Sequence, residues 1–234
     1  MKGSVIVHMK KIVKLISILV ISVLSLSINI DSNVFANDIS KTCKYDSDTK
    51  VNPDFSTMNC LLTETALKYD VPPEIVKAIA EGESGNWRHF DENGEAIVTV
   101  DNGIGIMQIT NQAGLDQNKL KSDLLYNIEE GVKILNNMFE KRKDVPIINN
   151  GHREHRDVLE HWYFAIMAYN GTKPENSPII QAKDVRNTKA YQERIFNIIK
   201  ERGLINLAEL RFTREDFSYD SNSRENIKFT KMQF

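Results

Sequence analysis

Apolar positions along this chain repeat with the period of an α-helix over most of its length. Five segments place apolar side chains on one helical face and polar side chains on the other: residues 61–70, 72–82, 126–139, 158–169 and 190–199. Pro72 and Pro73 suit the first turn of the second segment, because the N–H that proline lacks would be unbonded there. We therefore predict a mostly α-helical fold.

Two stretches break the helical pattern. Between Trp87 and Val100 the apolar residues follow no helical period, and residues 91–94 (Asp-Glu-Asn-Gly) are a turn signal. Residues 96–100 (Ala-Ile-Val-Thr-Val) predict a strand in a small β-hairpin. A polar loop from Asn149 to Arg156 separates the third and fourth helical segments.

The N-terminal residues have the order of a secretory signal peptide. Lysines precede an apolar run from Leu15 to Ile30, and Val34-Phe35-Ala36 supplies small residues at the two positions that a signal peptidase reads. We expect cleavage after Ala36 and a secreted, extracytoplasmic protein associated with the cell wall. An uncleaved membrane anchor is the alternative, although the run is short for a membrane span of about 20 residues.

The remaining chain divides into a polar leader (residues 37–56), a main domain (57–205) and a C-terminal extension (206–234) whose structure the pattern does not predict. The formal net charge is −2, and loss of residues 1–36 removes four lysines and one aspartate, so the mature chain is more acidic. An acidic chain without a basic stripe is a poor nucleic-acid binder, and we expect no nucleic-acid partner.

The chain has two cysteines, Cys43 and Cys60. In an exported protein an even number of cysteines favours a disulfide over metal binding. Two reduced thiols are the alternative, and in both cases the cysteines are expected to be structural.

Glu83 is the first candidate for catalysis. At 100° per residue it falls within a quarter turn of the apolar positions Ile75, Val76 and Ile79, whereas Glu81 points the opposite way. Burial and a helix C-terminus both disfavour a negative charge, so we expect a raised pKa for Glu83. A carboxylic acid of that kind can protonate a leaving-group oxygen. A helix-end glutamate that bends into solvent is the alternative.

A second cluster lies between Asp101 and Thr110, where Gly103 and Gly105 stand beside an apolar run that contains one polar residue, Gln108. Glycine allows close approach of the backbone, and Gln108 can hydrogen-bond an amide or a hydroxyl. The cluster lacks the longer glycine pattern and the lysine of a phosphate-binding loop, which excludes a nucleotide site of that type.

Five motifs together resemble the soluble lytic transglycosylase (SLT) family of the lysozyme-like superfamily. They occur in the family's order and cover residues 57–205: Glu83-Ser84, Gly105–Ile109, Asn127–Gly131, Ala168–Gly171 and Thr188–Tyr191. The resemblance implies a lysozyme-like helical domain with a glycan-binding groove and, beside it, the predicted β-hairpin.

The resemblance also implies an activity on the glycan strands of peptidoglycan. Glu83 would protonate the oxygen between N-acetylmuramic acid and N-acetylglucosamine, and the substrate's 2-acetamido group would stabilise the cationic carbon. Glu83 would then remove a proton from the C6 hydroxyl, which attacks to form a 1,6-anhydro end. Positions that match the family's substrate-binding residues are Ser84, Met107, Gln108, Tyr169, Asn170 and Tyr191. For Met107 and Tyr169, packing in the core is the alternative.

Two other functions remain open at this point. A goose-type-lysozyme-like hydrolase needs a second carboxylate to activate water; such enzymes tend to carry an aspartate where this chain has Thr110, which leaves Asp101 and Asp91 as candidates. A non-catalytic peptidoglycan-binding module is the other alternative, and retention of Glu83 argues against it. The insertions at residues 87–100 and 149–156 distinguish this chain from compact family members.

We expect no cofactor and no metal. His152, His155 and His161 surround a polar loop and a helix start, and their spacing fits no zinc motif, so solvated histidines are the expectation. No stable membrane insertion is expected once the signal peptide is removed.

Overall fold

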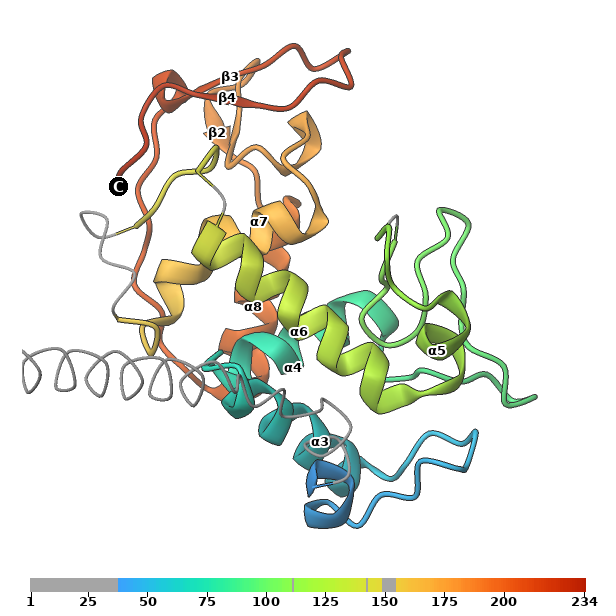
Figure 1. Ribbon diagram of the computed structural model, residues 1–234. Coiled ribbons are helices and arrows are strands. Elements are labelled where there is room, and N and C mark those ends of the chain that lie inside the picture. The colour runs from blue at the N-terminus through green and yellow to red at the C-terminus, as the bar shows by residue number, and fades with distance from the viewer. Residues whose placement is uncertain (1–37, 111, 142, 149–154) are drawn as a thin grey trace, which may run out of the picture. The chain divides into compact units, whose positions relative to one another are not determined.

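In the computed structural model, the described residues (38–234 except 111, 142 and 149–154) are arranged mainly as α-helices (Figure 1). The predicted signal peptide and most of the second insertion lie outside the described residues. Residues 38–42 are helical, and the α-helices that follow are α3 (Phe55–Lys68), α4 (Pro73–Ser84), α5 (Gln117–Ser122), α6 (Leu124–Lys141), α7 (Tyr163–Asn170) and α8 (Tyr191–Gly203). Short 3-10 helices are η1 (Leu159–Trp162), η2 (Pro174–Asn176) and η3 (Arg214–Asp216). Two antiparallel pairs of short strands join β1 (Ile179–Ile180) to β2 (Val185–Arg186) and β3 (Phe217–Ser218) to β4 (Lys228–Phe229).

Helix α6 forms the centre of the core, as its apolar period predicts. Ile128, Val132 and Leu135 are fully buried, and α3 and α7 pack against this helix (Figure 1). The mostly α-helical class predicted from the sequence is confirmed. None of the helices within the described ranges is long and apolar enough to cross a membrane.

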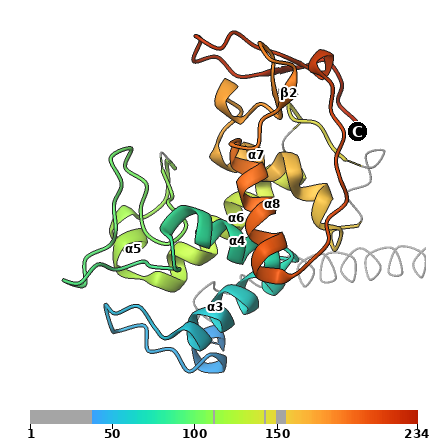
Figure 2. The ribbon, with the colours of Figure 1, turned by 180° about the vertical axis from the view of Figure 1, so that it is seen from behind.

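Helices α4 and α8 cross in contact with each other (Figure 2). Gly82 of α4 lies at this crossing. A Cβ atom at this position would lie 2.6 Å from Cδ1 of Ile195, which is fully buried on α8. The absence of a side chain at Gly82 therefore lets the two helices approach closely. The residues on either side of this glycine, Glu81 and Glu83, point to opposite sides of the crossing and contact opposite ends of α8.

The first insertion folds back on itself as predicted, but with little regular pairing. Phe90 bridges Ala96, Val98 bridges Ile104, and Ile104 in turn bridges Ile109. The strand expected at residues 96–100 is thus reduced to isolated bridges, and Val98 and Ile104 pair across a tight reversal at Asn102, whose φ is 64°.

The polar leader is tied to the main domain by a covalent bond and by side-chain hydrogen bonds. Cys43 and Cys60 are joined by a disulfide, with Cα atoms 5.6 Å apart. The Asn52 side chain accepts hydrogen bonds from the backbone N–H groups of His89 and Phe90 and donates to the Phe90 carbonyl. The leader therefore supports the first insertion as well as α3.

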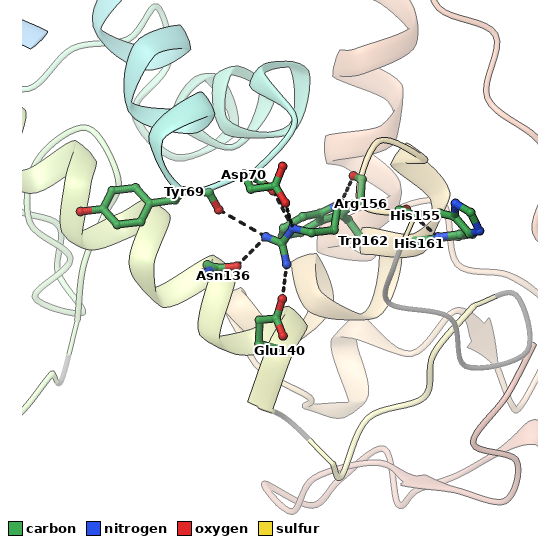
Figure 3. Close-up of polar contacts among 8 residues, drawn as sticks. All are labelled: Tyr69, Asp70, Asn136, Glu140, His155, Arg156, His161 and Trp162. Atoms are coloured by element: carbon green, nitrogen blue, oxygen red, sulfur yellow. Dashed lines mark hydrogen bonds and ion pairs between the residues drawn. The ribbon is translucent and has the colours of Figure 1, made fainter. Parts of the chain in front are cut away.

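Arg156, at the end of the second insertion, fixes the chain as it enters η1 (Figure 3). Its guanidinium binds Asp70, Glu140 and Asn136 and lies 4.9 Å from the ring centroids of Phe139 and Trp162. The Trp162 indole N–H donates to the Arg156 carbonyl at 2.8 Å. This one side chain therefore connects the end of α3, the end of α6 and the start of η1.

The C-terminal extension packs against α7 through aromatic rings. Phe164 of α7 contacts Phe212, Phe229 and Phe234, and Phe217 is 2% exposed. The alternation of polar and aromatic residues, which left this segment unassigned from the sequence, reflects aromatic side chains that enter the core while their neighbours remain in solvent.

Candidate active site

Glu83 lies in the last turn of α4, where it is half-buried between α4 and α8. Its Oε1 accepts a hydrogen bond from the Tyr191 hydroxyl at 2.5 Å. Tyr191 is the first residue of α8 and is only 4% exposed. The contact joins residues 108 positions apart in the sequence, and the close α4–α8 crossing makes it geometrically available.

Burial raises the pKa of Glu83 above its ordinary value, while the Tyr191 hydrogen bond and the Arg194 charge act in the opposite direction. Arg194 is exposed, and its guanidinium carbon lies 5.7 Å from the centroid of the Tyr191 ring. Together these effects leave the pKa of Glu83 above its ordinary value, so a larger fraction of the group is protonated than for a glutamate in water. A carboxylic acid in this state can donate a proton to a neighbouring oxygen.

Tyr169 is the second phenol of the site. Its hydroxyl donates to the backbone carbonyl of Met107 at 2.7 Å. Burial, and next the charge of Glu83, raise the pKa of Tyr169 well above the ordinary value, and the same two causes lead for Tyr191. Both phenols therefore keep their protons, and the hydroxyl that binds Glu83 is a neutral donor.

The loop that carries Met107 depends on a glycine at a crowded position. Gly105 has a φ of 68°, and a Cβ there would lie 2.3 Å from Nδ1 of His89 and 2.8 Å from Nδ2 of Asn127. Asn127, fully buried on α6, accepts from the Met107 N–H at 3.0 Å and donates to the carbonyls of Ile104 and Leu120. Asn127, which belongs to the motif Asn127–Gly131, therefore supports the loop formed by the motif Gly105–Ile109.

His89 supports the same loop from the first insertion. Its Nδ1 accepts from the Ile106 N–H at 3.2 Å, so Nε2 carries the proton and donates to the Lys121 carbonyl at 3.1 Å. Burial lowers the pKa of His89 to about 4. The imidazole is therefore neutral and holds backbone in place.

Gln108 and Met107 are held by their own surroundings. The Gln108 side chain donates to the Gly105 carbonyl at 2.8 Å and accepts from the Thr99 hydroxyl at 2.7 Å. The Met107 side chain is fully buried, and a Cβ at Gly131 would lie 2.6 Å from its Cβ. The sequence left open whether the Met107 side chain binds substrate or packs in the core, and in the structure it packs in the core. The Met107 carbonyl is the group that contacts Tyr169.

Ser84 and Asn170 lie at the ends of their helices. The Ser84 hydroxyl donates to the Ala80 carbonyl at 2.7 Å and accepts from the Arg88 N–H at 3.2 Å, so it caps the end of α4. Asn170 is exposed, and its Oδ1 accepts from Asn176 at 2.9 Å. Neither side chain has a hydrogen bond to Glu83 among the described contacts.

Asn176 is a positioning residue that no sequence pattern indicated. It is 4% exposed, and its Nδ2 donates to Asn170 and to the Gly171 carbonyl. Its Oδ1 accepts from the Tyr191 N–H at 3.1 Å, which satisfies one free N–H at the start of α8. The residue therefore links the end of α7 to Tyr191, whose hydroxyl binds Glu83, and its burial and hydrogen bonds reveal this role.

The candidate second carboxylates differ in their relation to Glu83. Burial is the main reason for the raised pKa of Glu83, and the charge of Asp101 adds to it. Asp91 instead accepts hydrogen bonds from the N–H groups of Asn93 and Glu95 within its own turn. Asp101 is therefore the carboxylate that acts on Glu83. Within the described ranges no group of three His, Cys, Asp or Glu residues could hold a metal ion.

A comparison with protein-family models matches residues 61–192, more than half of the chain, to the transglycosylase SLT domain. Neither the curated proteins nor the solved structures contain a match. The matched range includes Glu83, the Gly105 loop, α6, Tyr169 and Tyr191, which are the parts that form the site. The chain thus belongs to the transglycosylase SLT domain family, a member of the lysozyme-like superfamily.

Proposed function

We propose that this protein is an exported lytic transglycosylase that cleaves the β-1,4 bond between N-acetylmuramic acid and N-acetylglucosamine in peptidoglycan. The observation that carries the proposal is the half-buried Glu83, whose pKa is raised by burial and whose carboxyl group accepts a hydrogen bond from Tyr191. Family membership supplies the class of substrate.

In the proposed reaction Glu83 acts twice. It first donates its proton to the glycosidic oxygen, and the bond from C1 to that oxygen breaks as N-acetylglucosamine leaves with a hydroxyl. The substrate's own 2-acetamido group stabilises the positive charge on C1. The Glu83 carboxylate then takes the proton of the C6 hydroxyl, whose oxygen bonds to C1 and closes the 1,6-anhydro ring. Glu83 ends protonated, and no water is consumed.

The Tyr191 hydroxyl has a role in the middle of this cycle. A hydrogen bond to a carboxylate is stronger than one to the neutral acid. The Tyr191–Glu83 contact therefore stabilises the ionised carboxylate that exists between the two proton transfers. Tyr169, which binds the Met107 carbonyl, keeps the neighbouring loop in place during the same interval.

The test is mass spectrometry of the products from purified peptidoglycan. We expect muropeptides that are lighter by one water and carry 1,6-anhydro ends. Glu83→Gln should form none while its melting temperature stays close to that of the unchanged protein at acidic pH. Glu64→Gln, a change of the same kind on the neighbouring helix α3, is the matched control and should cleave normally. Normal cleavage by Glu83→Gln would refute the assignment.

Hydrolysis of the same bond is the second candidate, in which the exposed carboxylate of Asp101 would activate the attacking water. In that case the products would carry ordinary reducing ends, and Asp101→Asn would abolish them. If neither Glu83→Gln nor the unchanged protein gave products while both bound peptidoglycan, the non-catalytic binding module would be supported instead.

Export is proposed on separate grounds. The charged, apolar and small-residue order of residues 1–36 is that of a signal peptide, and a disulfide such as Cys43–Cys60 is typical of an oxidising compartment. N-terminal sequencing of the protein recovered from outside the cells should begin at Asn37. Recovery of the protein only in the membrane fraction, with a sequence that begins at the initiating methionine, would point to the uncleaved anchor.

A further inference from the structure

A pocket of about 540 Å³ lies on the other side of the α4–α8 crossing from Glu83. It is lined by the start of α3, by the face of α4 that carries Lys77 and Glu81, and by the end of α8 with Arg202. Glu81 marks the separation, because it binds Arg202 at one end of α8 while Glu83 binds Tyr191 at the other. The size is within the range of pockets that bind small molecules, about 300–1,000 Å³.

One wall of the pocket is a stacked aromatic pair. The rings of Phe55 and Trp87 have centroids 4.8 Å apart and planes within 9° of parallel. The Trp87 indole N–H donates to the Lys77 carbonyl at 3.0 Å, which fixes the orientation of the indole. Phe55 is 75% exposed although it is a large apolar side chain. The protein therefore presents a fixed aromatic surface to solvent at the edge of a pocket.

The polar side chains around this pair are available for a ligand. Among the described contacts, the side chains of Asn59, Glu74, Lys77 and Asn86 make no hydrogen bond or ion pair, yet all four line the pocket. The four charged residues of the lining are two acids and two bases, and one pair of them, Glu81 and Arg202, is already joined at 2.9 Å. The lining is thus rich in donors and acceptors but carries no excess charge.

A sugar has the chemistry that complements this arrangement. The C–H groups on one face of a pyranose ring carry partial positive charge and pack on the negative face of an aromatic ring. The hydroxyl and acetamido groups at the rim of the sugar both donate and accept hydrogen bonds. They can therefore pair with the amide, carboxylate and ammonium side chains that line the pocket. An uncharged sugar also matches a lining without net charge.

We propose that this pocket is a second saccharide-binding site, which holds N-acetylhexosamine units of a glycan strand while Glu83 acts elsewhere on the polymer. The proposal rests on the proposed function for its choice of sugar. Two sites on one polymer raise the effective concentration of the strand at the active site, so a weak second site strengthens attachment to the wall.

Tryptophan fluorescence reports on this pocket, because Trp87 lines it and the second of the chain's two tryptophans, Trp162, is fully buried. The full chain carrying Glu83→Gln is titrated with the β-1,4-linked N-acetylglucosamine tetramer, and its binding to intact sacculi is measured by sedimentation. Phe55→Ala and Asn59→Ala are added singly to this background. Leu67→Ala is the matched control, because Leu67 is an apolar residue on α3 that is 58% exposed and does not line the pocket.

We expect the tetramer to change the fluorescence, and each pocket variant to weaken both the titration and sacculus binding by about three- to tenfold, while Leu67→Ala changes neither. Equal binding by Phe55→Ala, Asn59→Ala and Leu67→Ala would overturn the proposal. Because the background is inactive, the result is independent of cleavage. Failure of the unchanged protein to cleave peptidoglycan would overturn the proposed activity and leave the binding result standing.

Discussion

Asn127 offers the sharpest test of how the site is held together, because it touches no substrate in the proposed reaction. It is fully buried and makes three hydrogen bonds, to the Met107 N–H and to the carbonyls of Ile104 and Leu120. Asn127→Ala removes all three. The Met107 N–H has no other partner among the described contacts and would be left unsatisfied in the interior.

The expected loss follows from these contacts. The two hydrogen bonds to the carbonyls contribute about 1 kcal/mol each, and the loss of the third leaves the Met107 N–H buried and unsatisfied, which costs about 1–3 kcal/mol. We expect Asn127→Ala to lower the free energy of unfolding by about 3–5 kcal/mol and the melting temperature by about 6–20 °C. The protein should still fold, because a domain of this kind has about 5–15 kcal/mol of stability.

The assay is urea unfolding followed by circular dichroism, together with cleavage per folded molecule well below the melting temperature. Asn137→Ala is the matched control, because Asn137 is exposed on the same helix and shares the gain in helix propensity. Cleavage per folded molecule should also fall, since Met107 supplies the carbonyl that binds Tyr169. Stability within 1 kcal/mol of Asn137→Ala would refute the supporting role that we assign to Asn127.

Four further changes have defined outcomes. Burial raises the pKa of Glu83, and the hydrogen bond that Tyr191→Phe removes lowers it. In this variant the alkaline limb of the pH–rate profile should therefore move to higher pH while the rate falls, and an unchanged profile would contradict the prediction. Burial leaves the pKa of Glu83 higher in the folded than in the unfolded protein. The unchanged protein should therefore lose stability relative to Glu83→Gln as the pH rises from about 4.5 through the folded pKa. A difference in melting temperature that stays constant over this pH range would refute the prediction. Arg156→Ala should reduce the free energy of unfolding by about 2–4 kcal/mol, with Arg156→Lys recovering only part of it in the same denaturant titration. Cys43→Ser with Cys60→Ser should cost about 3 kcal/mol in non-reducing urea unfolding, and no change would show that the bond is dispensable.

The sequence predicted the parts of the fold that depend on local periodicity. The stripe of Ile128, Val132 and Leu135 predicts α6, and all three residues are fully buried. The same reasoning placed Glu83 on the inner face of α4, because a helix fixes direction at 100° per residue. What periodicity cannot give is the partner of an inward-facing side chain, since Tyr191 lies 108 residues away.

The parts that the sequence did not predict depend on contacts between distant segments. Asn176 looks like any polar loop residue until its burial and its bonds to Asn170 and Tyr191 are known. The aromatic residues of the extension follow no helical or strand period, because an irregular segment packs them one at a time against Phe164. The sequence alone also does not show whether Trp87 packs in the core or binds a ligand, and only the stack on Phe55 shows that it belongs to a surface pocket.

The acidity of Glu83 is set by packing more than by neighbouring charges. Burial is the largest cause of its raised pKa, and the charges that act on it, Arg194 and Asp101, are both exposed and oppose each other. Exposed charges are weakened by solvent and salt, so their difference is small beside the loss of solvation. That loss depends on α8 lying close to α4, which Gly82 permits. Gly82, the chain neighbour of Glu83, therefore contributes to the raised pKa of Glu83 by letting α8 lie close to α4.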